Sequence, residues 1–237
     1  MHLDRRDVIQ TLIDTRGYKK YLEIGVFLGK LFYSIRAKYK IAVDPNVKFT
    51  RFKLLKRSFK YKNNTNLKAS SYKLTSDDFF AKKAASLFKN RPIDICLVDG
   101  MHEYGFALRD VENSLKYLQP DGVIVMHDCN PANSEAAVDF ATWKKNDFKG
   151  NWNGDVWKAV VHLRSQRNDI NVFVLDADFG LGVITWGKPE SKLNFTADEI
   201  QKFTYQDLER NRKEFLNLKE PSYFFQYFNI AKSTLSN

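Results

Sequence analysis

The stretch Tyr21-Leu-Glu-Ile-Gly-Val-Phe-Leu-Gly29 is a short apolar run that ends in two glycines. It predicts a strand over residues 21–24, followed by a tight turn that leads into a helix. The turn lacks the GxGxxG spacing of a dinucleotide-binding loop, and Val26 and Phe27 block close approach of a pyrophosphate to the backbone. The loop therefore favours a ligand without phosphates, and Glu23 beside it favours a cationic one.

Short apolar runs alternate with longer amphipathic segments over the rest of the chain. We expect further strands at residues 41–43, 66–69, 93–98, 122–126, 171–175 and 182–186, the last two forming an antiparallel edge. Helical spacing is present at residues 49–59, 79–88, 106–118 and 157–163. Alternating strands and helices predict an α/β fold, a mostly parallel sheet with crossover helices on both faces.

Polar residues follow the expected strands where each strand ends. Ligands of such sheets bind outside the carboxyl ends of the strands, where Gly25, Asp44, Asp99, His127 and Asp128 would all lie. Asp44 comes 19 positions after Gly25, close to the ~20 expected of an acid that binds ribose hydroxyls. The sequence therefore predicts a ribose-containing ligand at this edge.

Composition indicates one domain over residues 1–237, with a core at about 20–186 and a helical tail at about 196–230. Of the 237 residues, 43% are hydrophobic, which suffices for one substantial core. No run approaches the ~18 apolar residues of a membrane span. The N-terminus is charged with no apolar stretch behind it, and Cys96 and Cys129 form no metal or disulfide pattern. We expect a cytoplasmic protein.

The chain is basic, with 38 Lys and Arg against 28 Asp and Glu and a net charge of +10. No acid occurs between Asp44 and Asp77, an interval that carries Lys48, Arg51, Lys53, Lys56, Arg57, Lys60, Lys62 and Lys68. Two interpretations stay open: a solvated helix face with a polar loop, or a rim that attracts a phosphate-bearing acceptor or nucleic acid.

S-adenosylmethionine (SAM) has the expected ligand chemistry: a ribose, an ammonium and a sulfonium, but no phosphate. The ExGxxxG pattern at Glu23, Gly25 and Gly29, with Asp44 after the second strand, resembles the class I SAM-dependent methyltransferases. The resemblance implies a Rossmann-like fold with a seven-stranded sheet. The segment Thr75-Ser-Asp-Asp-Phe-Phe80 is similar to the one that brackets adenine in that superfamily. The implied cofactor-binding residues are Glu23, Gly25, Gly29, Asp44, Ser76, Asp77 and Asp99.

Two further motifs, Asp99-Gly-Met-His-Glu-Tyr104 and Val123-Ile-Val-Met-His-Asp128, resemble a branch related to macrocin and other sugar O-methyltransferases. The resemblance implies that Asp99, His127 and Asp128 hold a divalent cation, for which these ligands suit Mg²⁺ or Mn²⁺. The branch often has Asp-Gly-Asp-His where this chain has Met101, so one carboxylate is missing. The segment Trp152-Asn-Gly-Asp-Val-Trp157 is also similar to this branch.

These motifs together predict an O-methyltransferase that acts on a sugar hydroxyl, in a free sugar, a nucleotide sugar or a glycan. His102 is the expected general base, with His127 as a ligand or the alternative base. Other readings remain: His102 as a helix cap, Asp128 as a turn residue, RNA or another polyanion as acceptor, and a catalytically silent SAM-binding scaffold. The aromatic tail, residues 223–228, is a candidate homodimer surface.

Overall fold

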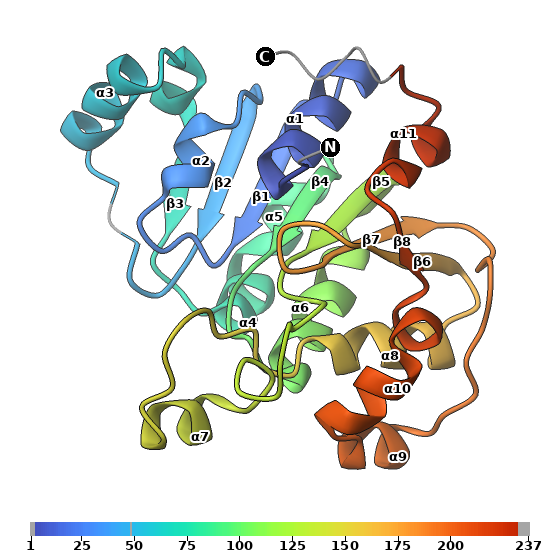
Figure 1. The fold of residues 1–237 in the computed structure, drawn as a ribbon. Helices are drawn as coiled ribbons and strands as arrows, with labels where there is room; N and C mark the ends of the chain where they lie inside the picture. The colour runs from blue at the N-terminus through green and yellow to red at the C-terminus, as the bar shows by residue number, and fades with distance from the viewer. Residues whose placement is uncertain (1–2, 48, 232–237) are drawn as a thin grey trace.

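One eight-stranded sheet forms the centre of the computed structural model, which describes residues 3–47 and 49–231 (Figure 1). Its strands are β1 (Lys20–Ile24), β2 (Tyr39–Val43), β3 (Ser70–Tyr72), β4 (Ile93–Val98), β5 (Leu118–Met126), β6 (Ile170–Leu175), β7 (Leu181–Trp186) and β8 (Leu218–Lys219). Their order across the sheet is β3-β2-β1-β4-β5-β7-β6-β8, and β7 runs antiparallel to both β5 and β6.

The expectation of seven strands is wrong by one, because the tail contributes β8. This two-residue strand pairs in parallel with β6 and is the outermost strand on that side of the sheet. The tail is therefore helical except where β8 joins the sheet.

Helices cover both faces of the sheet (Figure 1). One face packs against α1 (Arg5–Arg16), α2 (Lys30–Ser34) and α11 (Tyr223–Phe228). The other packs against α4 (Ser76–Phe79), α5 (Ala85–Phe88), α6 (Tyr104–Leu115), α8 (Trp157–Gln166), α9 (Ala197–Lys202) and α10 (Tyr205–Leu216). Figure 1 shows α3 (Arg51–Lys60) beyond the β3 edge and α7 (Phe140–Lys145) on a long loop below the sheet. Across the described residues, no helix combines the length and hydropathy needed to cross a bilayer.

The central strands bury side chains on both faces, which explains their unbroken apolar runs. Along β4, Ile95 and Leu97 belong to the core under α1 and α2. Cys96 and Val98 alternate with them and belong to the core under α6 and α8. Two cores of comparable size therefore fix the sheet between its helical layers.

The N-terminal helix α1 is an element that the sequence analysis did not anticipate. Asp4 caps it in a reciprocal box with Asp7, and Gly17 ends it in a left-handed conformation with a φ of 67°. Its side chains at positions 8, 9 and 12 are fully buried against the sheet. The helical spacing of Val8, Ile9, Leu12 and Ile13 was the available signal for this helix.

The expected third strand at residues 66–69 is wrong by several positions. Residues 64–68 form a 3₁₀ helix, η1 (Asn64–Lys68), and β3 follows it. Polar side chains explain the difference: Asn63 caps η1, and Asn66 accepts a hydrogen bond from the buried ammonium of Lys40. Buried amides with such partners favour a turn over an extended strand.

The aromatic tail packs into the chain itself. Phe224, Phe225 and Phe228 of α11 are buried in the core shared with α1. These three side chains are therefore core residues, whereas Tyr223 and Tyr227 are partly exposed. The homodimer stays a prediction.

Strand register brings the ends of four strands together. Ile24 pairs with Val43 on one side and with Val98 on the other, and Val98 pairs with Met126. The residues that follow these strand ends therefore lie along one edge of the sheet, where the sequence places its polar motifs.

Candidate active site

A cavity of about 820 Å³ lies over the carboxyl ends of the parallel strands. Eight of the ten predicted site residues line it, namely Glu23, Gly25, Gly29, Asp44, Asp99, His102, His127 and Asp128. They come from four strand ends that are distant in sequence. The fold therefore brings the glycine loop into a single cleft with the motifs at residues 99–104 and 123–128. We call these two the acceptor-end motifs.

The glycine loop is held by Asp44. One oxygen of this carboxylate accepts hydrogen bonds from the backbone N–H groups of Val26 and Phe27, each at 2.9 Å, and the other accepts from the N–H of Asn46 at 2.7 Å. Gly25 has a φ of +81°, and a Cβ there would lie 2.0 Å from the carbonyl oxygen of Asp99. Only glycine permits this contact between the β1 and β4 loops.

Glu23 is almost fully buried beneath the cleft, where it accepts a hydrogen bond from the hydroxyl of Tyr21. Burial is the main cause that raises the pKa of Glu23 to about 8, and the Tyr21 hydrogen bond opposes it only in part. A carboxyl group in this state is stabilised as the anion by a cationic ligand nearby.

The structure places Ser76 and Asp77 elsewhere, outside the residues that line this cavity. Asp77 forms an ion pair with Arg109 at 3.3 Å, with both side chains about half exposed, and Ser76 donates a hydrogen bond to Asp110. Both lie at the start of α4, which packs against α6. The cavity wall nearest Asp44 is instead formed by Pro45 and Asn46.

Two histidines flank the same pair of carboxylate oxygens at the acceptor end. Nε2 of His102 lies 3.4 Å from Asp99 Oδ1 and 3.2 Å from Asp128 Oδ2. Nδ1 of His127 lies 3.3 Å from the same Asp99 oxygen and 2.8 Å from the same Asp128 oxygen. Within this group, ligand atoms of Asp99, His102 and Asp128 all lie within 4.8 Å of one another, a spacing that suits a metal ion.

The two imidazoles differ in access and in their second contacts. His102 is 22% exposed, and its Nδ1 donates a hydrogen bond to the carbonyl of Trp152 at 2.9 Å, so that Nε2 faces the carboxylates and can donate to them when protonated. His127 is only 6% exposed. Burial alone lowers the pKa of His102, but its hydrogen bond to Asp99 and the charges of Asp128 and Asp99 outweigh burial and raise it. Burial also lowers the pKa of His127, but its hydrogen bonds to Asp128, Asp178 and Asp99 outweigh burial and raise it.

Arg5 and Asp178 complete this cluster, and the sequence analysis missed both. Arg5 reaches it from the first turn of α1, where its guanidinium contacts Nε2 of His127 and forms an ion pair with Asp178 at 3.2 Å. Asp178 lies in the turn between β6 and β7, 3.4 Å from the same ring nitrogen. The Asp-Phe-Gly turn after a predicted strand was the available signal for Asp178, whereas Arg5 had none.

The segment at residues 152–155 contacts both acceptor-end motifs and holds them in place. Asn153 donates to Asp128, and Asp155 accepts from the backbone N–H of Tyr104 at 2.6 Å. Gly154 has a φ of +63°, and a Cβ there would lie 1.6 Å from the carbonyl oxygen of His102. The ring of Trp152 stacks on that of His102, with their centroids 5.1 Å apart. Trp157, by contrast, is buried in the core.

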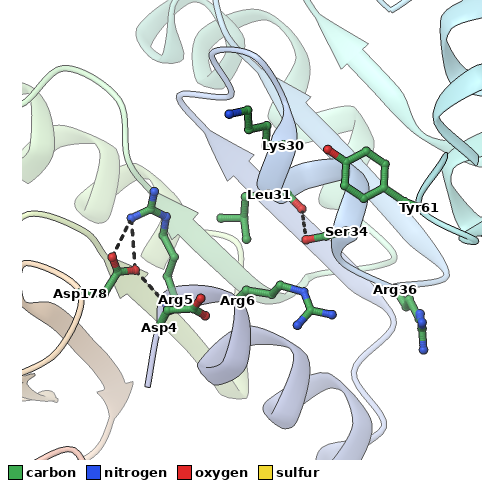
Figure 2. Close-up of a pocket in the computed structure, with 9 residues that line it drawn as sticks. All are labelled: Asp4, Arg5, Arg6, Lys30, Leu31, Ser34, Arg36, Tyr61 and Asp178. Atoms are coloured by element: carbon green, nitrogen blue, oxygen red, sulfur yellow. Dashed lines mark hydrogen bonds and ion pairs between the residues drawn. The ribbon is translucent and has the colours of Figure 1, made fainter. Parts of the chain in front are cut away.

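A second cavity of about 560 Å³ adjoins the first and shares Arg5, Lys30, Leu31 and Asp178 with it. Figure 2 shows Arg5 directed at Asp178, whereas the ammonium of Lys30 and the guanidinium of Arg36 point away from each other. These cations are therefore distributed around the cavity and do not converge on one point.

Residues 22–129 match the family model described as a methyltransferase domain. The match covers somewhat less than half of the 237 residues. Its matched region begins in β1 and ends directly after Asp128, so it includes every residue predicted to bind cofactor or metal. The predicted enzyme class, a methyltransferase, is confirmed by this match. A comparison with curated proteins finds no match.

Solved structures with this domain's fold include several O-methyltransferases. A proposed O-methyltransferase from Klebsiella pneumoniae has a TM-score of 0.56 at 9% identity, over 79% of this chain and 81% of the other. A proposed caffeoyl-CoA O-methyltransferase from Staphylococcus aureus has 0.54 at 15% identity, over 79% and 86%. TomG from Streptomyces achromogenes, an O-methyltransferase of tomaymycin synthesis in complex with SAM, has 0.51 at 13% identity, over 77% and 79%. The predicted Rossmann-like methyltransferase fold is therefore confirmed.

Proposed function

We propose that this protein is a SAM-dependent O-methyltransferase that methylates a sugar hydroxyl with the help of a divalent cation and a histidine base. One observation carries the proposal. A single cleft joins a glycine loop unsuited to phosphates, and an acid suited to ribose, to a cluster of two imidazoles and three carboxylates.

The cofactor end of the cleft fits SAM, which supplies a methyl group on a positively charged sulfur when bound. Asp44 lines the cavity and retains lone pairs for ribose hydroxyls beyond those used by the loop amides. Glu23 offers a buried carboxyl to a cation. The adenine-binding role expected of Ser76 and Asp77 passes in this proposal to Pro45, Asn46 and Met101, which line the cavity.

Charge balance in the polar cluster supports a divalent cation. Asp99, Asp128 and Asp178 supply three carboxylates, and Arg5 is the one permanent cation that contacts them among the described residues. Two negative charges remain, which either two imidazole protons or one Mg²⁺ or Mn²⁺ would neutralise. We assign Asp99, Asp128 and Nδ1 of the deeply buried His127 as its ligands, because this nitrogen lies 3.3 Å from Asp99 Oδ1 and 2.8 Å from Asp128 Oδ2. When bound, such a cation acts as a Lewis acid that makes the acceptor hydroxyl more acidic.

His102 is the better general base because it is the more exposed of the two histidines. Its Nδ1 proton is held by Trp152, so Nε2 is the atom that would accept the hydroxyl proton. Asp99 and Asp128 would then stabilise the imidazolium that forms. The ring of Trp152 beside it offers an apolar face against which a sugar can pack. Because methyl transfer is an in-line displacement, the remaining contribution of these residues is positioning.

Isothermal titration calorimetry tests the cofactor assignment directly. We expect the purified protein to bind SAM and not NAD, since the glycine loop excludes a pyrophosphate. Tight NAD binding without SAM binding would refute the proposal.

Metal dependence and the two histidine roles are tested by turnover with a panel of sugar acceptors and labelled SAM. We expect EDTA to abolish turnover and Mg²⁺ or Mn²⁺ to restore it. His127→Ala should weaken Mn²⁺ binding, whereas His102→Ala should keep Mn²⁺ and SAM affinity and lose rate by ~10²-fold or more. The reverse pattern would exchange the two roles, and turnover indifferent to EDTA would remove the cation.

A further inference from the structure

Helix α3 exposes three large apolar side chains on one face. Phe52 is 75% exposed, Leu55 45% and Phe59 77%. Their spacing of three and four residues aligns them in a single stripe along the helix. Leu54 and Ser58 are buried on another face, so α3 packs against the protein through different residues. The exposed stripe is therefore not required by the packing of α3.

Cations border this stripe. Lys56 and Lys60 are exposed and lie within a helical turn of the phenylalanines, and no acidic residue occurs between Asp44 and Asp77. A helix with an apolar stripe, a basic border and no acids is typical of segments that lie in the interface of an anionic membrane. The helix is also accessible, because it lies at the outer edge of the molecule beyond β3 (Figure 1).

We propose that α3 binds the surface of an anionic lipid bilayer, with Phe52, Leu55 and Phe59 inserted among the acyl chains and the neighbouring lysines at the headgroups. A second copy of this chain fits this face poorly, because a symmetric contact would oppose one basic border to another. RNA would neutralise the lysines but would leave an aliphatic side chain, Leu55, in the stripe without a stacking partner. The inference rests on α3 alone and is independent of the proposed reaction.

Vesicle flotation with the full chain tests this surface. We expect the protein to float with vesicles of equal parts phosphatidylcholine and phosphatidylglycerol, and to stay unbound with phosphatidylcholine alone. Added salt should reduce binding, because it screens the lysines. The double substitution Phe52→Ser/Phe59→Ser should weaken the partition constant at least tenfold, since it removes most of the inserted apolar area.

Matched variants distinguish binding through this surface from nonspecific binding to vesicles. Phe106→Ser removes an exposed phenylalanine of α6, and Lys144→Glu/Lys145→Glu reverses two cations of α7; neither should change flotation. Lys56→Glu/Lys60→Glu should reduce it at least tenfold. Circular dichroism and thermal melting of each variant verify folding, which exposed substitutions leave intact.

Three outcomes would overturn the proposal. The first is a wild-type protein that does not float with anionic vesicles, and the second is flotation unchanged by Phe52→Ser/Phe59→Ser. The third is a wild-type protein that ignores vesicles but binds RNA in a gel-shift assay, or a second copy in light scattering. In that case Phe52→Ser/Phe59→Ser would abolish the RNA binding or the self-association. SAM titration of the variants distinguishes this failure from failure of the proposed function, since α3 supplies none of the cleft residues.

Discussion

Asp44 performs a structural task before any ligand is present. Both of its carboxylate oxygens accept backbone hydrogen bonds, from the glycine loop on one side and from Asn46 on the other. The same group lines the cleft where a ribose is expected. Loss of this carboxylate would therefore disturb the loop and remove the ligand contact together.

We expect Asp44→Ala to weaken SAM binding at least tenfold, or ~1.4 kcal/mol, as measured by calorimetry. Asp77→Ala is the matched control, because Asp77 was also expected to bind cofactor but forms a surface ion pair with Arg109. It should leave affinity unchanged. Equal losses in the two variants would show that the cofactor lies against α4 and not over the cleft.

Gly154 is the residue that brings the 152–155 segment against His102. Its Cβ position is occupied by the His102 carbonyl oxygen, so Gly154→Ala must displace one of the two loops. We expect the variant to lose turnover with an acceptor and to melt at a lower temperature than wild type.

Gly17→Ala controls for backbone strain alone. Its φ of +67° nearly equals the +63° of Gly154, but nothing lies within 4 Å of its Cβ position. We expect Gly17→Ala to cost about 1–2 kcal/mol of stability and no turnover at saturating substrate. Retained activity in Gly154→Ala would show that the segment at residues 152–155 does not position His102.

At the scale of elements, α1 connects helix capping to the candidate site. The cap at Asp4 orders the first turn, and Arg5 in that turn reaches His127 and Asp178. The backbone N–H of Arg5 also donates to Asp178 at 3.0 Å. Stability of this helix terminus and charge in the polar cluster are therefore coupled.

We expect Asp4→Ala to lower the free energy of unfolding by about 1 kcal/mol, because it removes the acceptor for the N–H of Asp7. Denaturant unfolding measures the effect. Asp14→Ala, an exposed position on the same helix, should stay within about 0.5 kcal/mol of wild type. An Asp4→Ala protein as stable as the control would contradict the capping argument.

Burial of acidic groups affects the stability of the whole molecule. Asp110 on α6 is 3% exposed, and burial raises its pKa from 3.8 to about 7, more than its hydrogen bond with Ser76 lowers it. The folded state therefore binds a proton that the unfolded state releases between these two values. Across this window, the contribution of Asp110 to stability falls as the pH rises.

Asp110→Asn removes this titration while keeping the shape of the side chain. We expect the variant to exceed wild type in stability above pH 7, by up to about 4 kcal/mol, and the gain to shrink as the pH falls toward 3.8. Denaturant unfolding over a pH series measures it, with Asp14→Asn as the exposed control. A gain that is equal at every pH would exclude Asp110 as its source.

Local sequence patterns sufficed to predict the central strands of the sheet. The apolar runs that became β1, β2, β4 and β5 predicted buried parallel strands, since a strand covered on both faces needs apolar residues throughout. The Asp and His residues after them predicted an edge at which polar groups meet. Elements stabilised by distant partners were missed or displaced: η1 depends on the Asn66 contact with Lys40, and β8 exists only because β6 is beside it.

By itself, the sequence determined the α/β architecture, the methyltransferase class and the residues that follow the strand ends, because periodicity and strand termini are properties of short segments. Tertiary structure alone decided which of these residues share the cleft. It brought Arg5, Trp152 and Asp178 to the polar cluster and kept Ser76 and Asp77 out of the cavity lining. The physical reason is that contacts between distant segments depend on how helices and loops pack over the sheet, and no local spacing records that packing.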